Sequence, residues 1–566
     1  MDSAVEISAK DLPAGSNEPV SGAKLSRISI VYGAIVSLIF ALILCIWHTL
    51  DHRQPSMDEA GHILCAFSYS DLLSHAHPFK GWWWTKLLTV NNFYPPAVYA
   101  FNGFLKIFFG PDRWVDWLSL ALYDFALTFS VYGTTLLLTG RRTAAIVASV
   151  CVNFYAELIF LSHTFLLDFQ VACMISVGLF CMVWWNEKPT WKRAILTGFA
   201  LALILMTKQV AGAFLAGPGL FYFARCFSDL KSGGKTRIAQ LVTMALIAVI
   251  LMVPWAVASY GFISEFAETN KKVITSTVGA ISVPQALQRG IRYYSFVFPD
   301  VVTPLMMALF VIGAAISGKK AHIRFLPVTL SAVLGIVMIS LLPWQFPHHR
   351  YAASALIAPA VYTGWAFSRV INWKFLPGKI VLVIVSVVAV LQYFSLCFFP
   401  YPFAQPTFMV GLSDWLGAKA SSMGVETRGK STPVAFQDWG QAWVLESIEK
   451  RDHKAPLWLN VMANHVEYNP HTFSLIAKAT GSLIKPTSSR TWTVLGDTVT
   501  FSKASALYYH WYLLKTGDSG HKLLNEESRI ANEGLLNFVQ NSGKFEEIAR
   551  RKVPDGSEIL LYRQKN

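Results

Sequence analysis

The stretch ISIVYGAIVSLIFALILCIWHTLDHRQPSMDEAGH, residues 28–62, joins a long apolar run to a polar segment. The run at 28–49 contains no Asp, Glu, Lys or Arg, and it has the length of about 20 residues that a membrane-crossing helix needs. The polar segment then places Asp58, Glu59 and His62 within five positions. We therefore predict a transmembrane anchor that is followed at once by a candidate site at the membrane surface.

The whole chain has the composition of a polytopic membrane protein. Of its 566 residues, 54% are hydrophobic and 14% are charged, and the mean hydropathy is +0.42, whereas soluble domains carry about 25% charged residues. The segment 194–225 is too long for one span and is interrupted by Lys208, so it predicts two short spans that turn near this lysine. Further apolar runs cover 115–139, 143–161, 165–185, 238–259, 300–317, 325–342, 353–368 and 379–399. Together these runs predict about eleven spans.

The formal net charge of +14 comes largely from basic clusters between the apolar runs. If 194–225 crosses the membrane twice, these clusters all face one side, as the positive-inside rule requires. This pattern predicts a cytoplasmic N-terminus and an extracytoplasmic C-terminus, and it disfavours nucleic acid as a partner. The seven cysteines lie mostly within apolar runs and lack CxxC spacing, which favours membrane-core residues over disulfides or a metal site.

The predicted organisation has three parts. Residues 1–27 are polar and indicate a disordered cytoplasmic tail, and 28–400 form an α-helical membrane domain. Residues 401–566 form an extracytoplasmic α/β domain, in which AWVLESIEKR and PHTFSLIAKATG predict helices and PLWLNV predicts a strand. The sequence FEEIARRKVPDGSEILLYRQ predicts two strands around a turn.

Two outer loops precede that domain. The loop 50–114 holds the acidic segment, together with a short apolar stretch at 94–110 that predicts an interfacial helix, since it is too short to span. The loop 260–299 contains ETNKKVITSTVGAISVPQALQRGIRYYSF. Both loops and the α/β domain are expected on the same membrane face.

The segment Asp58-Glu59-Ala60-Gly61-His62 allows three interpretations. Asp58 and His62 share a helix face at i, i+4, which leaves a weak divalent metal site open, although such sites need three or four ligands. The acids also suit the start of a helix, where the helix dipole favours negative charge. The third interpretation is a catalytic base.

Three further polar groups occur where apolar runs begin or end. Asp168, in HTFLLDFQ, lies about one turn inside a span, where a carboxylate usually faces a cavity or a partner. Lys208 either extends to the interface or binds a lipid phosphate. In LPWQFPHHRYAAS, His348 and Arg350 are candidates to bind a phosphate, which Arg can contact through two hydrogen bonds. The alternative is that Trp344, Arg350 and Tyr351 anchor the chain at the interface. Two acids and several cations at one face suit transfer from a lipid-linked phosphate donor.

The sequence resembles the integral-membrane glycosyltransferases of the GT-C class, in particular bacterial relatives of protein O-mannosyltransferases and of the lipid A aminoarabinose transferase. The resemblance covers roughly 28–400. Its motifs occur in family order and read PSMDEAGH, YPPAVYAFNGFLKIFFG, TFLLDFQVA, LTGFALALILMTKQVAG and HHRYAASALIAPAV.

This resemblance implies an inverting transferase that uses a polyprenyl-phosphate sugar at the outer membrane face. It assigns the base to Asp58, with Glu59 and Asp168 shaping the catalytic site. The loop 260–299 corresponds to a mobile loop that closes over the donor, and Arg292 and Tyr293 are its candidate substrate contacts.

One motif departs from the family. Phe93-Tyr94-Pro95-Pro96 stands where aminoarabinose transferases have Glu-Lys-Pro-Pro. The contacts to the donor phosphate would then come from Lys208, His348 and Arg350, with Tyr94 beside them. No metal ligand is assigned, and a divalent metal cofactor has only weak support.

The resulting hypothesis is a bacterial inner-membrane glycosyltransferase that moves a sugar from an undecaprenyl-phosphate carrier to an extracytoplasmic lipid, glycan or protein. One alternative is a transporter or flippase of lipid-linked saccharides. Another is an inactive scaffold whose C-terminal domain recruits partners.

Overall fold

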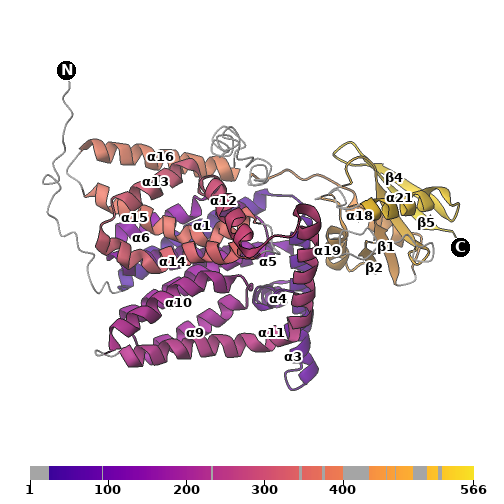
Figure 1. Ribbon diagram of the computed structural model, residues 1–566. Coiled ribbons are helices and arrows are strands. Elements are labelled where there is room, and N and C mark those ends of the chain that lie inside the picture. The colour runs from indigo at the N-terminus through magenta and orange to yellow at the C-terminus, as the bar shows by residue number, and fades with distance from the viewer. Residues whose placement is uncertain are drawn as a thin grey trace.

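The computed structural model describes residues 25–91, 93–230, 234–342, 347–372, 376–398, 432–453, 456–463, 465, 467–488, 506–519 and 526–565. Most of the predicted N-terminal tail, 1–27, lies outside these residues, as does the first part of the predicted α/β domain. The described chain forms a helical bundle with a small sheet domain at one end (Figure 1).

Every predicted apolar run is helical. The bundle consists of α1 (Arg27–Leu50), α5 (Arg113–Thr139), α6 (Arg142–Asn153), α7 (Ala156–Ser162), α8 (Leu167–Glu187), α9 (Trp191–Leu205), α10 (Ala211–Ser228), α11 (Gly234–Val278), α12 (Val283–Val302), α13 (Pro304–Ala315), α14 (Lys319–Ser340), the 3₁₀ helix η2 (His349–Leu356), α15 (Ile357–Ile371) and α16 (Leu376–Phe398). The expected α-helical membrane fold is therefore confirmed.

The number of helices that could cross a membrane is smaller than the predicted eleven. Among the described residues, six helices are long and apolar enough, or up to eight if the bent pairs α6/α7 and α12/α13 each count as one span. The helices α9, α10 and α15 do not meet this criterion. The segment 194–225 nevertheless forms two helices with Lys208 in the turn between them, as its interrupted pattern predicts.

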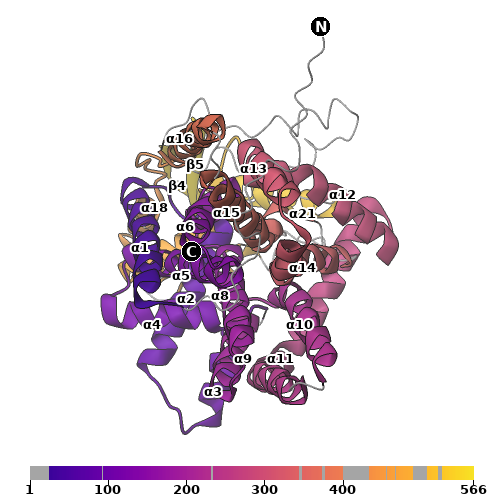
Figure 2. The same ribbon diagram turned by 90° about the vertical axis from the view of Figure 1, so that its left-hand side faces the viewer.

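The centre of the bundle is formed by α5 and α8, which pack against each other and are largely buried. The helix α1 packs on α5, and α15 packs on α6. Figure 2 looks at the bundle from the side away from the sheet domain and shows α10 beside α14 and α8 beside α9. Many Ile, Leu and Val side chains of α1, α11 and α16 are exposed, which is the pattern of helices that face lipid.

Three helices occupy the segment 50–114: α2 (Met57–Ser74), α3 (Gly81–Thr89) and α4 (Ala97–Phe109). The expected short helix at 94–110 is thus present as α4. The segment 260–299, which was expected to be a loop, is mostly helical, because α11 continues to Val278 and α12 already begins at Val283. The sequence Ser282-Val283-Pro284-Gln285 accounts for this start, since Ser282 and Gln285 form a capping box and proline suits the first helical turn.

The C-terminal domain is an α/β domain, as predicted. Its sheet has the order β2-β1-β3-β5-β4, in which β1 pairs in parallel with β2 and β3, while β5 is antiparallel to β3 and β4. The elements are α18 (Gln441–Glu449), β1 (Leu457–Val461), α19 (Pro470–Thr480), β2 (Ile484–Thr487), β3 (Trp511–Lys515), α21 (Glu526–Asn541), β4 (Phe545–Lys552) and β5 (Glu558–Gln564).

The sheet domain contacts the bundle at two places. The helix α19 packs on α2, where Lys478 Nζ lies 2.5 Å from the Asp71 carboxylate. Val434 binds the segment that follows α1: its N–H donates to Asp51 Oδ1 at 3.0 Å, and its carbonyl accepts from the His52 N–H at 3.0 Å. These contacts fix the domain to α2 and to the segment that precedes it.

Candidate active site

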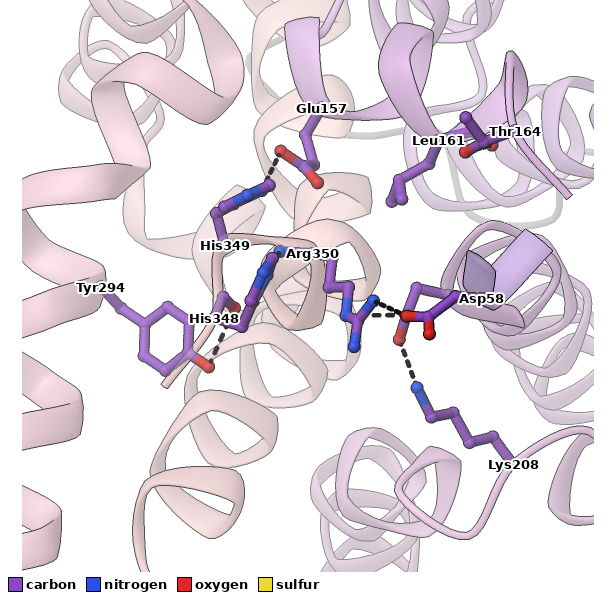
Figure 3. A network of polar contacts seen from close by, with 10 residues as sticks. Asp58, Glu157, Leu161, Thr164, Lys208, Tyr294, His348, His349 and Arg350 are labelled. Atoms are coloured by element: carbon purple, nitrogen blue, oxygen red, sulfur yellow. Dashed lines mark hydrogen bonds and ion pairs between the residues drawn. The ribbon is translucent and has the colours of Figure 1, made fainter. Parts of the chain in front are cut away.

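Asp58, Asp168, Lys208 and Arg350 come from four separate elements and meet in one cluster. Figure 3 labels three of them, Asp58, Lys208 and Arg350. Lys208 Nζ donates to Asp168 Oδ1 at 2.6 Å. The Arg350 guanidinium lies between two acids, with Nε 3.4 Å from Asp168 Oδ2 and Nη1 3.6 Å from Asp58 Oδ2. Two of the three predicted acids, Asp58 and Asp168, thus form one continuous chain of charges with two of the predicted cations.

The start of α2 positions Asp58. Glu59 Oε2 accepts the Ser56 N–H at 3.3 Å as part of a capping box, which satisfies a backbone donor at the helix start. Asp58 lies in the same turn, and its carboxylate is 56% exposed, whereas the Asp168 side chain is only 7% exposed. Asp58 is therefore the acid that a substrate can reach.

The environment of Glu59 differs from that of Asp58. Its Oε1 accepts the N–H of Phe165 at 3.1 Å, so both carboxylate oxygens bind backbone amides. Burial raises the pKa of Glu59, and the nearby Arg113 opposes this effect. Glu59 thereby links the start of α2 to the residues just before α8, which brings Asp58 and Asp168 together.

The Tyr94 segment is held against the turn that carries Lys208. Asn91 Oδ1 accepts the N–H groups of Phe93 and Tyr94 at 3.0 and 2.9 Å, and Gln209 Nε2 donates to the Phe93 carbonyl. As a result the Lys208 ammonium lies 5.6 Å from the centre of the Tyr94 ring, and it lies 5.1 Å from that of Tyr351. Both distances suit cation–π contacts.

The charge of Lys208 is stabilised despite its burial. Burial alone would lower the pKa of this ammonium, but Asp168, Tyr94 and Tyr351 raise it, and the net direction is upward. Burial would also lower the pKa of Arg350, but Asp168, Tyr351 and Asp58 together raise it, and the net direction is again upward. Both cations therefore keep their charge at neutral pH.

The turn before η2 contains His348, whose Nδ1 accepts the Arg350 N–H at 3.3 Å, while Tyr294 Oη donates to its carbonyl at 3.3 Å. Burial and the neighbouring His349 and Arg350 lower the pKa of His348 to about 3. The imidazole is therefore neutral, and it can contact a phosphate through a neutral N–H.

The next residue, His349, has a partner that the sequence interpretation missed. His349 Nδ1 lies 2.8 Å from Glu157 Oε2, and both side chains are at most 1% exposed (Figure 3). This buried pair fixes the backbone beside Arg350. The sequence contained one indication of this pair: Glu157 lies within the apolar run 143–161, where a carboxylate usually has a partner.

The two residues expected from the loop 260–299 lie on α12. Tyr293 is buried and packs edge-on against Tyr294, with 5.2 Å between the ring centres. Its contact with the site is therefore indirect and runs through Tyr294. Arg292 is exposed and makes no hydrogen bond or ion pair within the described part of the chain. The structure does not bring Arg292 to the cluster of four charges.

A cavity of about 680 Å³ lies on one side of the charged cluster. Asp58, His348 and Arg350 line it, and the sheet domain closes it with Val434, Gln437 and Trp439 among its lining residues. Asp168, Lys208 and Tyr94 lie outside this lining. The cluster therefore has two sides, with Asp58 and Arg350 between the cavity and the Asp168–Lys208 pair.

The described residues contain no group of three or more His, Cys, Asp and Glu side chains that could hold a metal ion. His62, the second residue of the suspected metal pair, instead contacts Tyr99, with His62 Nδ1 2.8 Å from Tyr99 Oη. The geometry thus offers Asp58 no further metal ligand among these residues.

Comparisons with known proteins address the overall architecture. The ArnT protein of Cupriavidus metallidurans bound to undecaprenyl phosphate matches over 93% of this chain and 97% of its own, with a TM-score of 0.50 and 14% identity. The chain has the fold of GT-C glycosyltransferases. An Archaeoglobus fulgidus oligosaccharyltransferase tethered to an acceptor peptide shares this fold, with a TM-score of 0.51 and 12% identity over 96% of this chain and 74% of its own.

The sequence of this GT-C-fold protein supports the same assignment. Residues 75–270 match the family model of dolichyl-phosphate-mannose-protein mannosyltransferases. No curated relative matches the sequence significantly. The resemblance found in the motifs is therefore confirmed at the level of the GT-C class.

The environment of His62 predicts how stability depends on pH. Burial lowers the pKa of His62 to about 4, although Asp58 opposes this effect, whereas an unfolded histidine titrates near 6.5. As the pH falls from about 6.5 to about 4, the unfolded chain binds the proton first, so the folded state should lose on the order of 1–3 kcal/mol. Thermal inactivation in detergent across this pH range measures the loss.

The matched variants are His62→Gln and His75→Gln. His62→Gln should flatten the decline between pH 6.5 and 4. His75, an exposed residue at the end of the same helix, should leave the decline unchanged when it is replaced. An identical pH dependence in wild type and His62→Gln would show that another group is responsible.

Proposed function

We propose that this protein transfers a sugar from a polyprenyl-phosphate donor to a hydroxyl group of an extracytoplasmic lipid, glycan or protein. The observation that carries the proposal is the position of Asp58 and Arg350 between a large cavity and the buried Asp168–Lys208 pair. The GT-C fold supports it, and so does the undecaprenyl phosphate bound to the ArnT structure.

In the proposed mechanism the acceptor enters the cavity, and Asp58 removes the proton of its attacking hydroxyl group. The acceptor oxygen forms a bond to the anomeric carbon, and the bond between that carbon and the phosphate oxygen breaks. Attack from the face opposite the leaving group inverts the configuration. The electron pair leaves with the phosphate, so stabilising that developing charge is the second task of the site.

The cations supply this stabilisation. Lys208 has three N–H donors, and its contact with Asp168 leaves donors for a phosphate. Arg350 offers a planar group of donors that suits phosphate, and its contacts with Asp168 and Asp58 hold this group at the cavity. Asp168 holds the two cations near each other, while Tyr94 and His348 border this region. Glu59 acts by positioning Asp58.

We also propose that the site faces outward. Basic residues occur at helix ends remote from Asp58 along the bundle, at 141–142, 188, 192–193, 225 and 319–320. By the positive-inside rule this supports a cytoplasmic location for those ends. The sheet domain and the cavity then lie outside the bacterial inner membrane, where lipid-linked donors and envelope acceptors meet.

The direct test uses purified protein reconstituted with a polyprenyl-phosphate sugar and extracted envelope acceptors. Mass spectrometry should detect a glycosylated acceptor together with released polyprenyl phosphate. Movement of the intact donor across a vesicle membrane without a new glycosidic bond would identify a flippase instead. Absence of both activities, with donors and acceptors of several classes, would favour the scaffold hypothesis.

A further inference from the structure

A second cavity, of about 450 Å³, lies among the far ends of the bundle helices. It is formed by the last turns of α8 and α10, the first turns of α14 and the end of α5. Its lining includes Leu138, Glu187, Arg225, Ile323 and Arg324. The proposed sugar transfer uses none of these residues.

The length of α8 separates this cavity from the catalytic cluster. Asp168 lies in the first turn of the helix and Glu187 is its last residue. At a rise of about 1.5 Å per residue the two are about 28 Å apart, close to the thickness of about 30 Å of a bilayer's hydrocarbon core. Figure 1 agrees, since α10 joins α11 on the side of the bundle away from the sheet domain. The cavity therefore opens at the other membrane surface.

The charges in the cavity favour an anion. The lining includes two arginines, Arg225 and Arg324, but a single carboxylate, that of Glu187. Arg324 Nη1 donates to the Leu138 carbonyl at 3.2 Å, which fixes this guanidinium at the end of α5. The Arg225 guanidinium makes no hydrogen bond or ion pair with the other described residues, although the Glu187 carboxylate is near enough to attract it. Arg225 thus has its planar set of donors available for a ligand.

The surface beside the cavity is apolar and open to lipid. Leu220 and Phe223 on α10 are 61% and 43% exposed, and Ile323 on α14 is 52% exposed. Because α10 packs along α14, these side chains form an apolar border on both helices. An anionic site next to such a border suits a molecule that has a charged head and hydrocarbon chains.

We propose that this cavity binds the phosphate headgroup of an anionic phospholipid in the leaflet opposite the catalytic site. Arg225 and Arg324 contact the phosphate, and the acyl chains lie along the exposed residues of α10 and α14. This site is independent of the proposed transfer reaction, because none of its residues contacts the catalytic cluster.

The test is native mass spectrometry of the full-length protein in detergent, with phosphatidylglycerol and phosphatidylcholine of identical acyl chains as probes. Wild type should retain phosphatidylglycerol preferentially. Arg225→Gln should weaken that retention about tenfold, the usual effect of losing one hydrogen bond to a charged group. Lys192→Gln, which removes an exposed positive charge outside the cavity lining near the same membrane surface, should leave it unchanged.

Two further measurements identify the source of the phosphate and test whether the variants remain folded. If millimolar inorganic phosphate displaces phosphatidylglycerol from wild type but not from Arg225→Gln, the anion site stands and a soluble phosphate also occupies it. Equal retention of both lipids would overturn the proposal, as would equal losses in Arg225→Gln and Lys192→Gln. Thermal inactivation of both variants shows whether each remains folded.

Discussion

Replacing Asp58 by asparagine is expected to lower the rate of sugar transfer by about 10²–10⁴-fold, the contribution of a general base. Asparagine keeps the size of the side chain but cannot accept the proton of the attacking hydroxyl group. The Asp58 side chain is 56% exposed at a cavity wall, so its replacement should leave the fold intact. The rate is measured as single-turnover formation of glycosylated acceptor by reconstituted protein.

Asp71→Asn is the matched control for this variant. Asp71 lies on the same helix, and its carboxylate is 61% exposed in an ion pair with Lys478. Exposed ion pairs contribute about 0–1 kcal/mol to stability, so this substitution should change transfer little. Full activity of Asp58→Asn would show that Asp58 is not the base. An equal loss of transfer activity in both variants would indicate that the substitutions disturb the structure of α2.

The second large effect is expected for Asp168→Asn. Lys208 is 7% exposed and would lose the carboxylate that compensates its charge, which typically destabilises a protein by about 3–5 kcal/mol. Lys208→Met should destabilise the protein less, because the Asp168 carboxylate keeps its ion pair with Arg350 at 3.4 Å. The double variant should be more stable than Asp168→Asn alone yet remain inactive. Thermal inactivation and transfer rates of the three variants test this order.

The buried pair Lys106–Asp116 offers the control. Lys106 Nζ lies 3.0 Å from the Asp116 carboxylate, both side chains are at most 3% exposed, and the pair joins α4 to α5 outside the charged cluster. Asp116→Asn should cost comparable stability while the surviving folded protein keeps its affinity for the donor. If Asp168→Asn likewise kept donor affinity, the assigned role of the Asp168–Lys208 pair would be wrong.

Much of this architecture can be predicted from local patterns. Apolar runs of suitable length predict the bundle helices, and Lys208 within 194–225 predicts a turn between two of them. Asp168 is recognisable because a carboxylate inside an apolar run needs a partner. In the sheet domain, PLWLNV and PHTFSLIAKATG became β1 and α19, since strand and cap signals act over a few residues.

Contacts between distant segments could not be predicted in the same way. Asp168, Lys208 and Arg350 come from separate elements, and only tertiary packing decides which cation meets which acid. The His349–Glu157 pair depends on how α7 approaches η2. The helical start at Val283 was locally visible in its capping box, but a loop was expected because 260–299 lies between two predicted spans. The cavity depends on the docking of Val434, which has no local sequence signal.

The two hydrogen bonds of Val434 impose an evolutionary constraint on chain length. They hold residues 51–52 just after α1, and α2 begins only at Met57. The connection 51–56 is therefore fixed at both ends, and one inserted residue would rotate Asp58 away from Arg350. Insertions should be tolerated instead at the outer edge of the sheet, in the turn between β4 and β5, where Gly556 has a positive φ and open space around it. Homologues that diverge in acceptor should accordingly vary in the sheet domain while conserving the number of residues between α1 and Asp58.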